Sequence, residues 1–162
     1  ALYLDDHYPE HALLRSDPKL RAQALEINQI SNKLGMYVRR WGLAHALSES
    51  DEPLEIMIGE KGYLRKFEKF SKPIIKSLVS KGYQLDSEKV IHAKVSMDEI
   101  IIDLNARLNA NQGRYLVGDR LGLADIAVCS MLAPLLEIEG TPWEKEMSSD
   151  ISEDYHNFKL YR

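Results

Sequence analysis

Apolar residues recur every three or four positions along most of the chain, and almost no stretch alternates with a period of two. Spacing near ~3.6 places side chains on one face of an α-helix, whereas strands alternate. The longest run begins after Asp17, which can cap a helix, and Pro18, which suits a first turn. We predict a long helix here, with a bend at Gly35 or Gly42. Its apolar stripe comprises Leu20, Ala24, Ile27, Ile30, Leu34, Val38 and Trp41.

Further helical stretches follow a polar loop that ends in Pro53. The next runs to about Gly82, and Pro73 is expected to kink or split it because proline removes a backbone bond. A helix beginning at residue 86 or 87 ends at residues 111–113, and another runs from Gly122 to about Pro134. Residues 143–150 are predicted to form a loop, and residues 152–158 a short helix. The pattern predicts an all-α fold, a helical bundle of about five or six helices.

The net charge of −4 gives no reason to expect nucleic acid as a partner, because phosphate binding needs a basic surface. A local group of lysines in the second helical stretch is interpreted as a solvated face, with a binding patch as the alternative. No apolar run approaches the roughly 20 residues of a membrane span, and the first residues do not resemble a signal peptide. We therefore expect a soluble, cytoplasmic protein without a membrane partner. The lysines are Lys66, Lys69, Lys72 and Lys76.

Residues with catalytic or metal-binding chemistry form no convincing constellation. His7 and His11 have the spacing of a helical metal pair, but Pro9 between them argues against a shared helical face, so no metal site is predicted. Ser130 is expected to bond a carbonyl one turn back rather than act as a nucleophile. Cys129, the single cysteine, excludes an intrachain disulfide and is expected to be a small buried apolar residue. We predict no catalytic residue in this chain.

Residues 115–127 carry the most specific local pattern. Gly118 makes a turn and a helix opens at Gly122, three residues before Asp125. A carboxylate at that position can accept a hydrogen bond from the N–H of the cap residue and favours the positive end of the helix. Leu121 and Ile126 have the spacing of a hydrophobic staple. We therefore assign Gly122 and Asp125 a structural capping role.

This segment resembles the capping motif of the C-terminal domain of glutathione transferases, in which a YLxGD turn precedes a helix that opens with Ser/Thr-x-Ala-Asp. Gly122 replaces the usual Ser or Thr, so half of the reciprocal capping box is missing, at a cost of a few tenths of a kcal/mol (about 0.3). The first residues are similar to the junction between the two domains of this family, with YLD…YP followed by DP…RA. The matching motif residues are Tyr115, Leu116, Gly118, Asp119, Leu123, Ala124 and Asp125.

The resemblance implies a domain division and a function. Residues 1–16 would be the end of an N-terminal domain and a linker, and residues 17–162 the helical domain. The thiol-activating residue and the glutathione site would lie in the N-terminal thioredoxin-like domain, outside this chain, so that no cofactor is expected here and glutathione is a co-substrate of the parent protein. The helical domain would supply a hydrophobic wall for the electrophile and part of a homodimer surface, a role in detoxification.

In the family this wall comes mainly from the first long helix. By that resemblance the candidate substrate-binding residues are Gln29, Lys33, Met36 and Tyr37, which lie off the main apolar stripe. The alternative interpretation makes Met36 and Tyr37 core or dimer-contact residues and leaves Gln29 and Lys33 solvated. A different function is also open, a non-catalytic protein-interaction module of the kind found in translation factors and aminoacyl-tRNA synthetases. A helical bundle that binds an unrelated ligand in its core is the third hypothesis.

Overall fold

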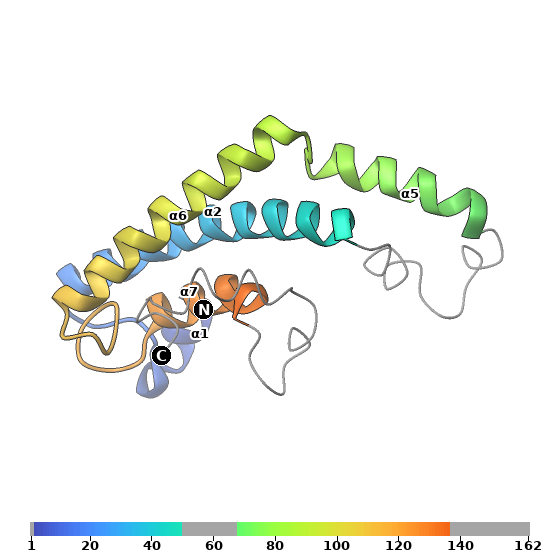
Figure 1. Ribbon diagram of the computed structural model, residues 1–162. Coiled ribbons are helices and arrows are strands. Elements are labelled where there is room, and N and C mark those ends of the chain that lie inside the picture. The colour runs from blue at the N-terminus through green and yellow to red at the C-terminus, as the bar shows by residue number, and fades with distance from the viewer. Residues whose placement is uncertain (1, 50–67, 137–162) are drawn as a thin grey trace.

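The computed structural model describes residues 2–49 and 68–136, and all regular structure in these ranges is helical (Figure 1). Five α-helices and two 3-10 helices are present there, without a strand, so the all-α prediction is confirmed. The α-helices are α1 (Leu2–His7), α2 (Pro18–Glu49), α5 (Glu68–Gly82), α6 (Ser87–Ala110) and α7 (Leu123–Leu132). The 3-10 helices are η1 (Pro9–His11) and η2 (Ala133–Leu135). The loop predicted at residues 143–150 and the short helix at residues 152–158 lie outside the described residues.

Helix α2 begins where the sequence predicts a cap. The Asp17 carboxylate accepts hydrogen bonds from the N–H groups of Lys19 (2.8 Å) and Leu20 (3.0 Å), which have no partner inside the helix. The helix then continues to Glu49 without interruption at Gly35 or Gly42. Two glycines are therefore tolerated in one long element, because packing against its neighbours outweighs their low helix propensity.

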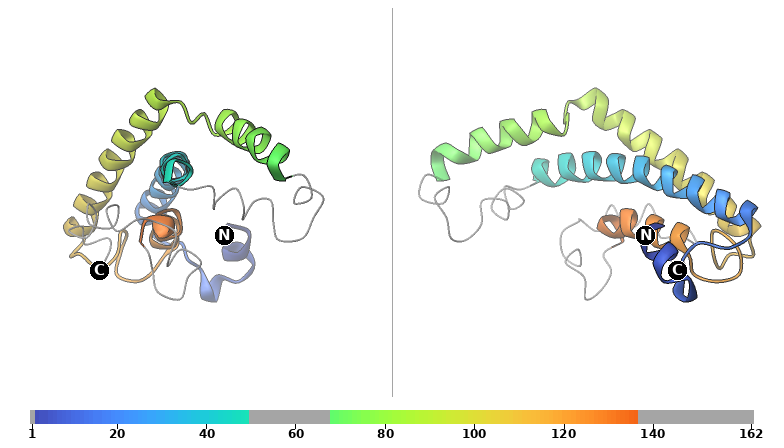
Figure 2. Two further views of the ribbon diagram at one scale, coloured as in Figure 1. Left: turned by 45° about the vertical axis from the view of Figure 1, so that its right-hand side comes forward. Right: turned by 180° about the vertical axis from the view of Figure 1, so that it is seen from behind.

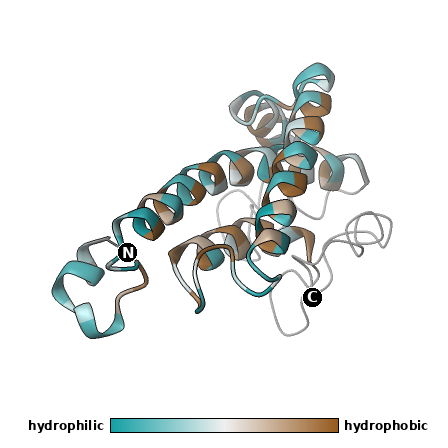
Figure 3. Cartoon of the chain, turned by 90° about the vertical axis from the view of Figure 1, so that its left-hand side faces the viewer, coloured by the Kyte–Doolittle hydropathy of each residue, from teal (hydrophilic) through white to brown (hydrophobic). Residues whose placement is uncertain are grey.

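Helices α2, α6 and α7 enclose the main core. Figures 1 and 2 show α6 running antiparallel to α2 along one side, while α7 lies along another side of α2. Apolar side chains along α6 are buried at intervals of three or four residues, and Figure 3 shows apolar and polar stretches alternating along the long helices. The largest fully buried apolar side chains are those of Ile27, Leu34, Met97, Ile101, Leu104, Val128, Leu132 and Leu135.

The crossing of α2 and α7 depends on Gly35. A Cβ atom added to Gly35 would overlap the Sδ atom of Met131, much closer than van der Waals contact allows. By contrast, a Cβ added to Gly42 would meet nothing within 4 Å. Gly35 therefore serves as a contact point between two helices.

Helix α5 packs on the C-terminal half of α2. Leu47 and Val79 form a small separate cluster, and the Nε atom of Arg40 donates a hydrogen bond to the backbone oxygen of Tyr83 (3.0 Å). The helix includes Pro73 in its interior, so the predicted split does not occur between Glu68 and Gly82. The part of this stretch before residue 68 lies outside the described residues.

Helix α6 begins and ends close to the predicted positions. The carboxylate of Asp86 accepts a hydrogen bond from the N–H of Lys89 (3.0 Å), which caps the first turn. At the other end, the N–H of Gly113 donates to the backbone oxygen of Leu108 (2.7 Å). The first left-handed residue after the helix is Gln112 (φ 65), a position where glycine is usual. Gly113, the predicted terminating glycine, thus comes one residue after Gln112, the first residue with a positive φ angle.

Candidate functional site

One long side of α2 is covered by neither α6 nor α7. The side chain of Tyr37 is turned toward His92 of α6, with ring centroids 6.0 Å apart, and Gly35 faces Met131 of α7. Between these two sides lies a third, which we call the free face of α2. It comprises Gln29, Lys33, Met36, Arg39 and Arg40.

The structure places three of the four predicted wall residues together. Gln29, Lys33 and Met36 are exposed and follow one another at intervals of one helical turn. Met36 leaves 46% of its surface exposed, which is high for a large apolar side chain. Tyr37 is different, because it is half-buried and packs against the main core. The free face thus has an adaptable apolar centre among polar side chains.

Sequence reasoning missed the charge of this face. No Asp or Glu occurs in α2 between Glu26 and Glu49, whereas Lys33, Arg39 and Arg40 all fall there. The sequence could have revealed this, because Lys33 and Arg40 are seven residues apart, the spacing of one helix face, and Arg39 is next to Arg40. The result is a cationic strip on a chain whose net charge is −4.

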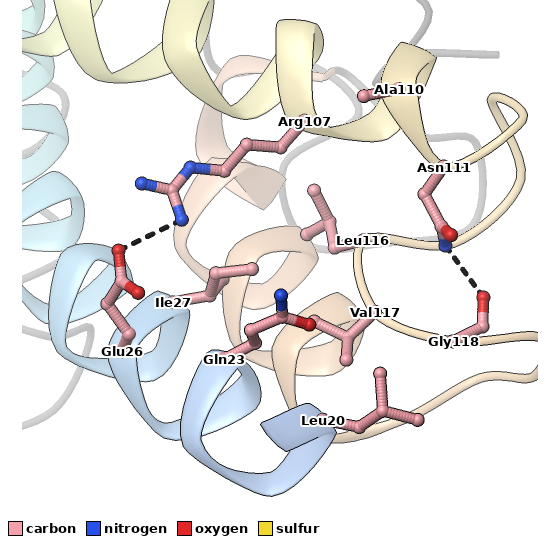
Figure 4. A pocket seen from close by; sticks show the side chains of 10 residues that line it. All are labelled: Leu20, Gln23, Glu26, Ile27, Arg107, Ala110, Asn111, Leu116, Val117 and Gly118. Carbon is pink, nitrogen blue, oxygen red and sulfur yellow. Dashed lines mark hydrogen bonds and ion pairs between the residues drawn. The ribbon is translucent and has the colours of Figure 1, made fainter.

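A pocket of about 350 Å³ opens at the other end of α2, between its first turns, the end of α6 and residues 116–118 (Figure 4). Arg107 reaches its rim, where Nη1 lies 2.9 Å from Oε1 of Glu26 and Nε lies 2.8 Å from Oδ2 of Asp103. Partial burial opposes the charge of Arg107, but the hydrogen bonds that it donates to Glu26 and then to Asp103 outweigh this effect and raise the pKa of the guanidinium. Because two carboxylates already compensate this cation, Arg107 gives the pocket little attraction for an anion.

The N-terminus of α7 is organised by Asp125. Its carboxylate accepts hydrogen bonds from the N–H of Gly122 (2.9 Å) and from the N–H of Leu116 (2.7 Å). Gly122 has no side chain to complete the reciprocal box. A Cβ there would lie 3.0 Å from the backbone oxygen of Leu13, which accepts a hydrogen bond from the N–H of Leu123. The glycine therefore permits the segment before α2 to approach the helix.

The two residues of the predicted staple are both exposed, Leu121 by 57% and Ile126 by 41%. The staple contact between them stays a prediction. Asp125, which is buried, connects the loop before α7 to the helix, because its carboxylate accepts a hydrogen bond from a backbone N–H of the loop. The cap is held mainly by hydrogen bonds.

A second buried carboxylate fixes the segment before α2. Asp5 of α1 accepts hydrogen bonds from the N–H groups of Leu13 (3.0 Å) and Leu14 (2.7 Å). The next residue, Arg15, is also buried and its Nη2 atom donates to the backbone oxygen of Arg120. Residues 13–15 are thus connected both to α1 and to the loop before α7.

Cys129 and Ser130 lie on the exposed side of α7. The expectation that Cys129 is buried is wrong, because the residue is exposed at the helix surface. Surrounding protein atoms still desolvate the thiolate and, with a smaller contribution from Asp125, raise the pKa of the thiol. A thiol with a raised pKa is a poor nucleophile near neutral pH. Ser130 donates to the backbone oxygen of Ala127 (2.9 Å), as predicted.

The comparisons with known proteins define the family. A sequence model of the glutathione S-transferase C-terminal domain matches residues 63–160, which is more than half of the chain and includes the capping segment. The chain therefore belongs to this family. No curated protein and no solved structure shows significant similarity to it. Within residues 2–49 and 68–136, no helix has the length and apolar character needed to cross a membrane.

Proposed function

We propose that this chain is the C-terminal domain of a cytoplasmic glutathione transferase and provides a wall of the electrophile site. Residues 1–16 would be the end of a preceding thioredoxin-like domain and the linker, and residues 17–162 the helical domain. The observation that carries the proposal is the free face of α2, where Met36 is exposed between polar side chains. Such a surface accepts a small apolar molecule and leaves the chemistry to another domain.

Glutathione would be activated by a residue of the preceding domain, which lowers the pKa of its thiol so that the thiolate attacks the electrophile. The helical domain would position the electrophile, with Met36 in apolar contact and Gln29 and Lys33 at the edge. Tyr37 would support this wall from the side of α6, since it is half-buried against the core. These four residues have no part in the proton transfer.

The second part of the proposal is a homodimer surface on α6. Ile91, Val95 and Ile102 are exposed by 65%, 52% and 58% and lie on one line along the helix. A row of exposed large apolar residues is typical of a protein–protein contact. We expect Val95→Glu together with Ile102→Glu to convert the dimer to a monomer in analytical ultracentrifugation. A mass that corresponds to a monomer before any substitution would contradict this part.

The test of the transferase function is conjugation of glutathione to chlorodinitrobenzene. The chain alone and the chain joined to its glutathione-binding domain are assayed side by side. We expect activity only in the joined form and a higher KM for the electrophile in Met36→Ala. Met131→Ala is the matched control, because that methionine belongs to α7 and lies against Gly35, on another side of α2. Absence of both conjugation and glutathione binding in the joined form would favour a non-catalytic protein-interaction module.

A further inference from the structure

The cations of the free face differ from the cations of α6 in their surroundings. Across residues 2–49 and 68–136, Lys33 and Arg39 have no carboxylate within ion-pair distance. Arg40 donates its Nε hydrogen to a neutral backbone oxygen, which leaves its charge uncompensated by that bond. In contrast, the cations on α6 are paired: Lys89 with Asp86, Lys94 with Asp98, and Arg107 with Glu26 and Asp103.

The positions of these cations suit one kind of ligand. On a helix, Lys33 and Arg39 flank Met36 on its two sides, and Arg40 lies one turn further along. Met36 provides an adaptable apolar contact for an aromatic ring, while a lysine or arginine head group can reach an acidic substituent of that ring. Arg40 is held by its bond to Tyr83, so less side-chain freedom is lost when it binds an anion.

We propose that the free face of α2 selects electrophiles that carry an anionic group, such as an aryl halide with a carboxylate. This inference rests on the proposed transferase function and adds the class of substrate. Local positive charge on a chain of net charge −4 raises the concentration of an anionic ligand at this face. The preference is electrostatic and therefore decreases as ionic strength rises.

The experiment compares chlorodinitrobenzene with chlorodinitrobenzoate, which differ by one carboxylate. The kcat/KM values for both are measured in the protein that joins this chain to its glutathione-binding domain. We expect the double variant Lys33→Gln/Arg39→Gln to lower the ratio of the carboxylate value to the neutral value by about tenfold, because two exposed charges that attract the carboxylate are removed. Arg40 is left unchanged because its bond to Tyr83 connects α2 to α5.

Two further variants make the result specific. Lys19→Gln removes an exposed positive charge at the start of α2, away from the free face, and should leave the ratio unchanged. The charge-preserving variant Lys33→Arg/Arg39→Lys should keep the original ratio. An equal loss in Lys19→Gln would overturn the inference, and so would an effect confined to the KM for glutathione.

The assay also separates this inference from the function on which it rests. Conjugation of the neutral substrate with an unchanged ratio in the double variant would overturn the anionic preference and leave the transferase function standing. Absence of conjugation with either substrate would overturn both. The charged face predicts that, among the variants, only the double variant loses the preference for the anionic substrate. It also predicts that the original protein loses this preference at high salt.

Discussion

The Oδ1 atom of Asp125 accepts a hydrogen bond from the backbone N–H of Leu116 at 2.7 Å, which connects α7 to the loop before it. Its second oxygen caps the helix at Gly122. The same residue therefore explains both the turn and the helix start of the sequence motif. A short carboxylate in a buried position can do this because both of its oxygens have backbone donors.

Substitution of Asp125 by Ala should be strongly destabilising. Two buried N–H groups would lose their acceptors, at about 1–3 kcal/mol each, so we expect the free energy of unfolding to fall by about 2–5 kcal/mol. Asp125→Asn should cost less, because it keeps one acceptor oxygen. Urea denaturation of the intact protein measures the change. Asp6→Ala, at an exposed position of α1, is the control and should have an effect within about 0.5 kcal/mol.

The glycines of α2 provide a matched pair of substitutions. Gly35→Ala should destabilise the protein by about 1–2 kcal/mol, because the new methyl group displaces Met131 and disturbs the contact with α7. Gly42→Ala has open space and should stabilise it by about 0.5–1 kcal/mol through helix propensity. Thermal unfolding of both variants measures the difference. Equal effects of the two substitutions would contradict the close helix contact.

The C-terminus of α6 should be stabilised by glycine. Gln112 has a positive φ angle of 65, which costs a residue with a Cβ atom about 1 kcal/mol relative to glycine. Gln112→Gly should therefore raise the free energy of unfolding by roughly that amount. Gln23→Gly, in the interior of α2, is expected to lower it instead by about 1 kcal/mol. Chemical denaturation of the two variants reveals whether their effects have opposite signs.

The cap of α6 should give a specific pH dependence. The hydrogen bond from the N–H of Lys89 is the main reason that the pKa of Asp86 lies below its ordinary value. Because the folded-state pKa is the lower one, the stabilisation is complete above the unfolded-state value of about 3.9 and is lost as pH falls through the folded value. The original protein should be more stable than Asp86→Asn, whose amide caps the helix without titrating. This difference in the free energy of unfolding should shrink in that pH window. An advantage that stays constant into strong acid would argue against the charged cap.

The reactivity of Cys129 should also depend on pH. Since partial burial and the charge of Asp125 raise the pKa of its thiol, the thiolate fraction near neutral pH is smaller than in free cysteine. We expect slow alkylation by iodoacetamide despite the exposed position, and a rate that continues to rise above pH ~8.5. Mass spectrometry of the modified protein gives the rate. A rate at neutral pH that equals or exceeds that of a free thiol would contradict the raised pKa.

The helix pattern could be predicted from the sequence because each helix has a local cause. Asp17 and Asp86 cap α2 and α6 as their positions suggest, and the apolar stripes of both helices are buried. Gly35 could not be assigned from sequence, since its role depends on Met131, nearly a hundred residues later. The prediction that Cys129 is buried is wrong for a related reason, because a helix rich in apolar residues still has an exposed side.

The candidate wall illustrates the same limit. Helical spacing placed Gln29, Lys33 and Met36 on one face, but the direction of Tyr37 depends on where α6 lies. The uncompensated charge of Lys33 and Arg39 likewise becomes visible only when the positions of the acidic residues are known. The side chains on each face of a helix follow from its own sequence. Which face stays exposed depends on how the other helices pack against it.

The backbone oxygen of Leu13 receives the N–H of Leu123, while Leu13 donates its own N–H to Asp5. The motif at the start of α7 is therefore short in sequence, but its hydrogen bonds are complete only when the segment before α2 packs against it. The most recognisable segment of this protein is thus completed by a contact from a distant part of the sequence. If the segment before α2 moved away, the backbone N–H of Leu123 would lose its acceptor.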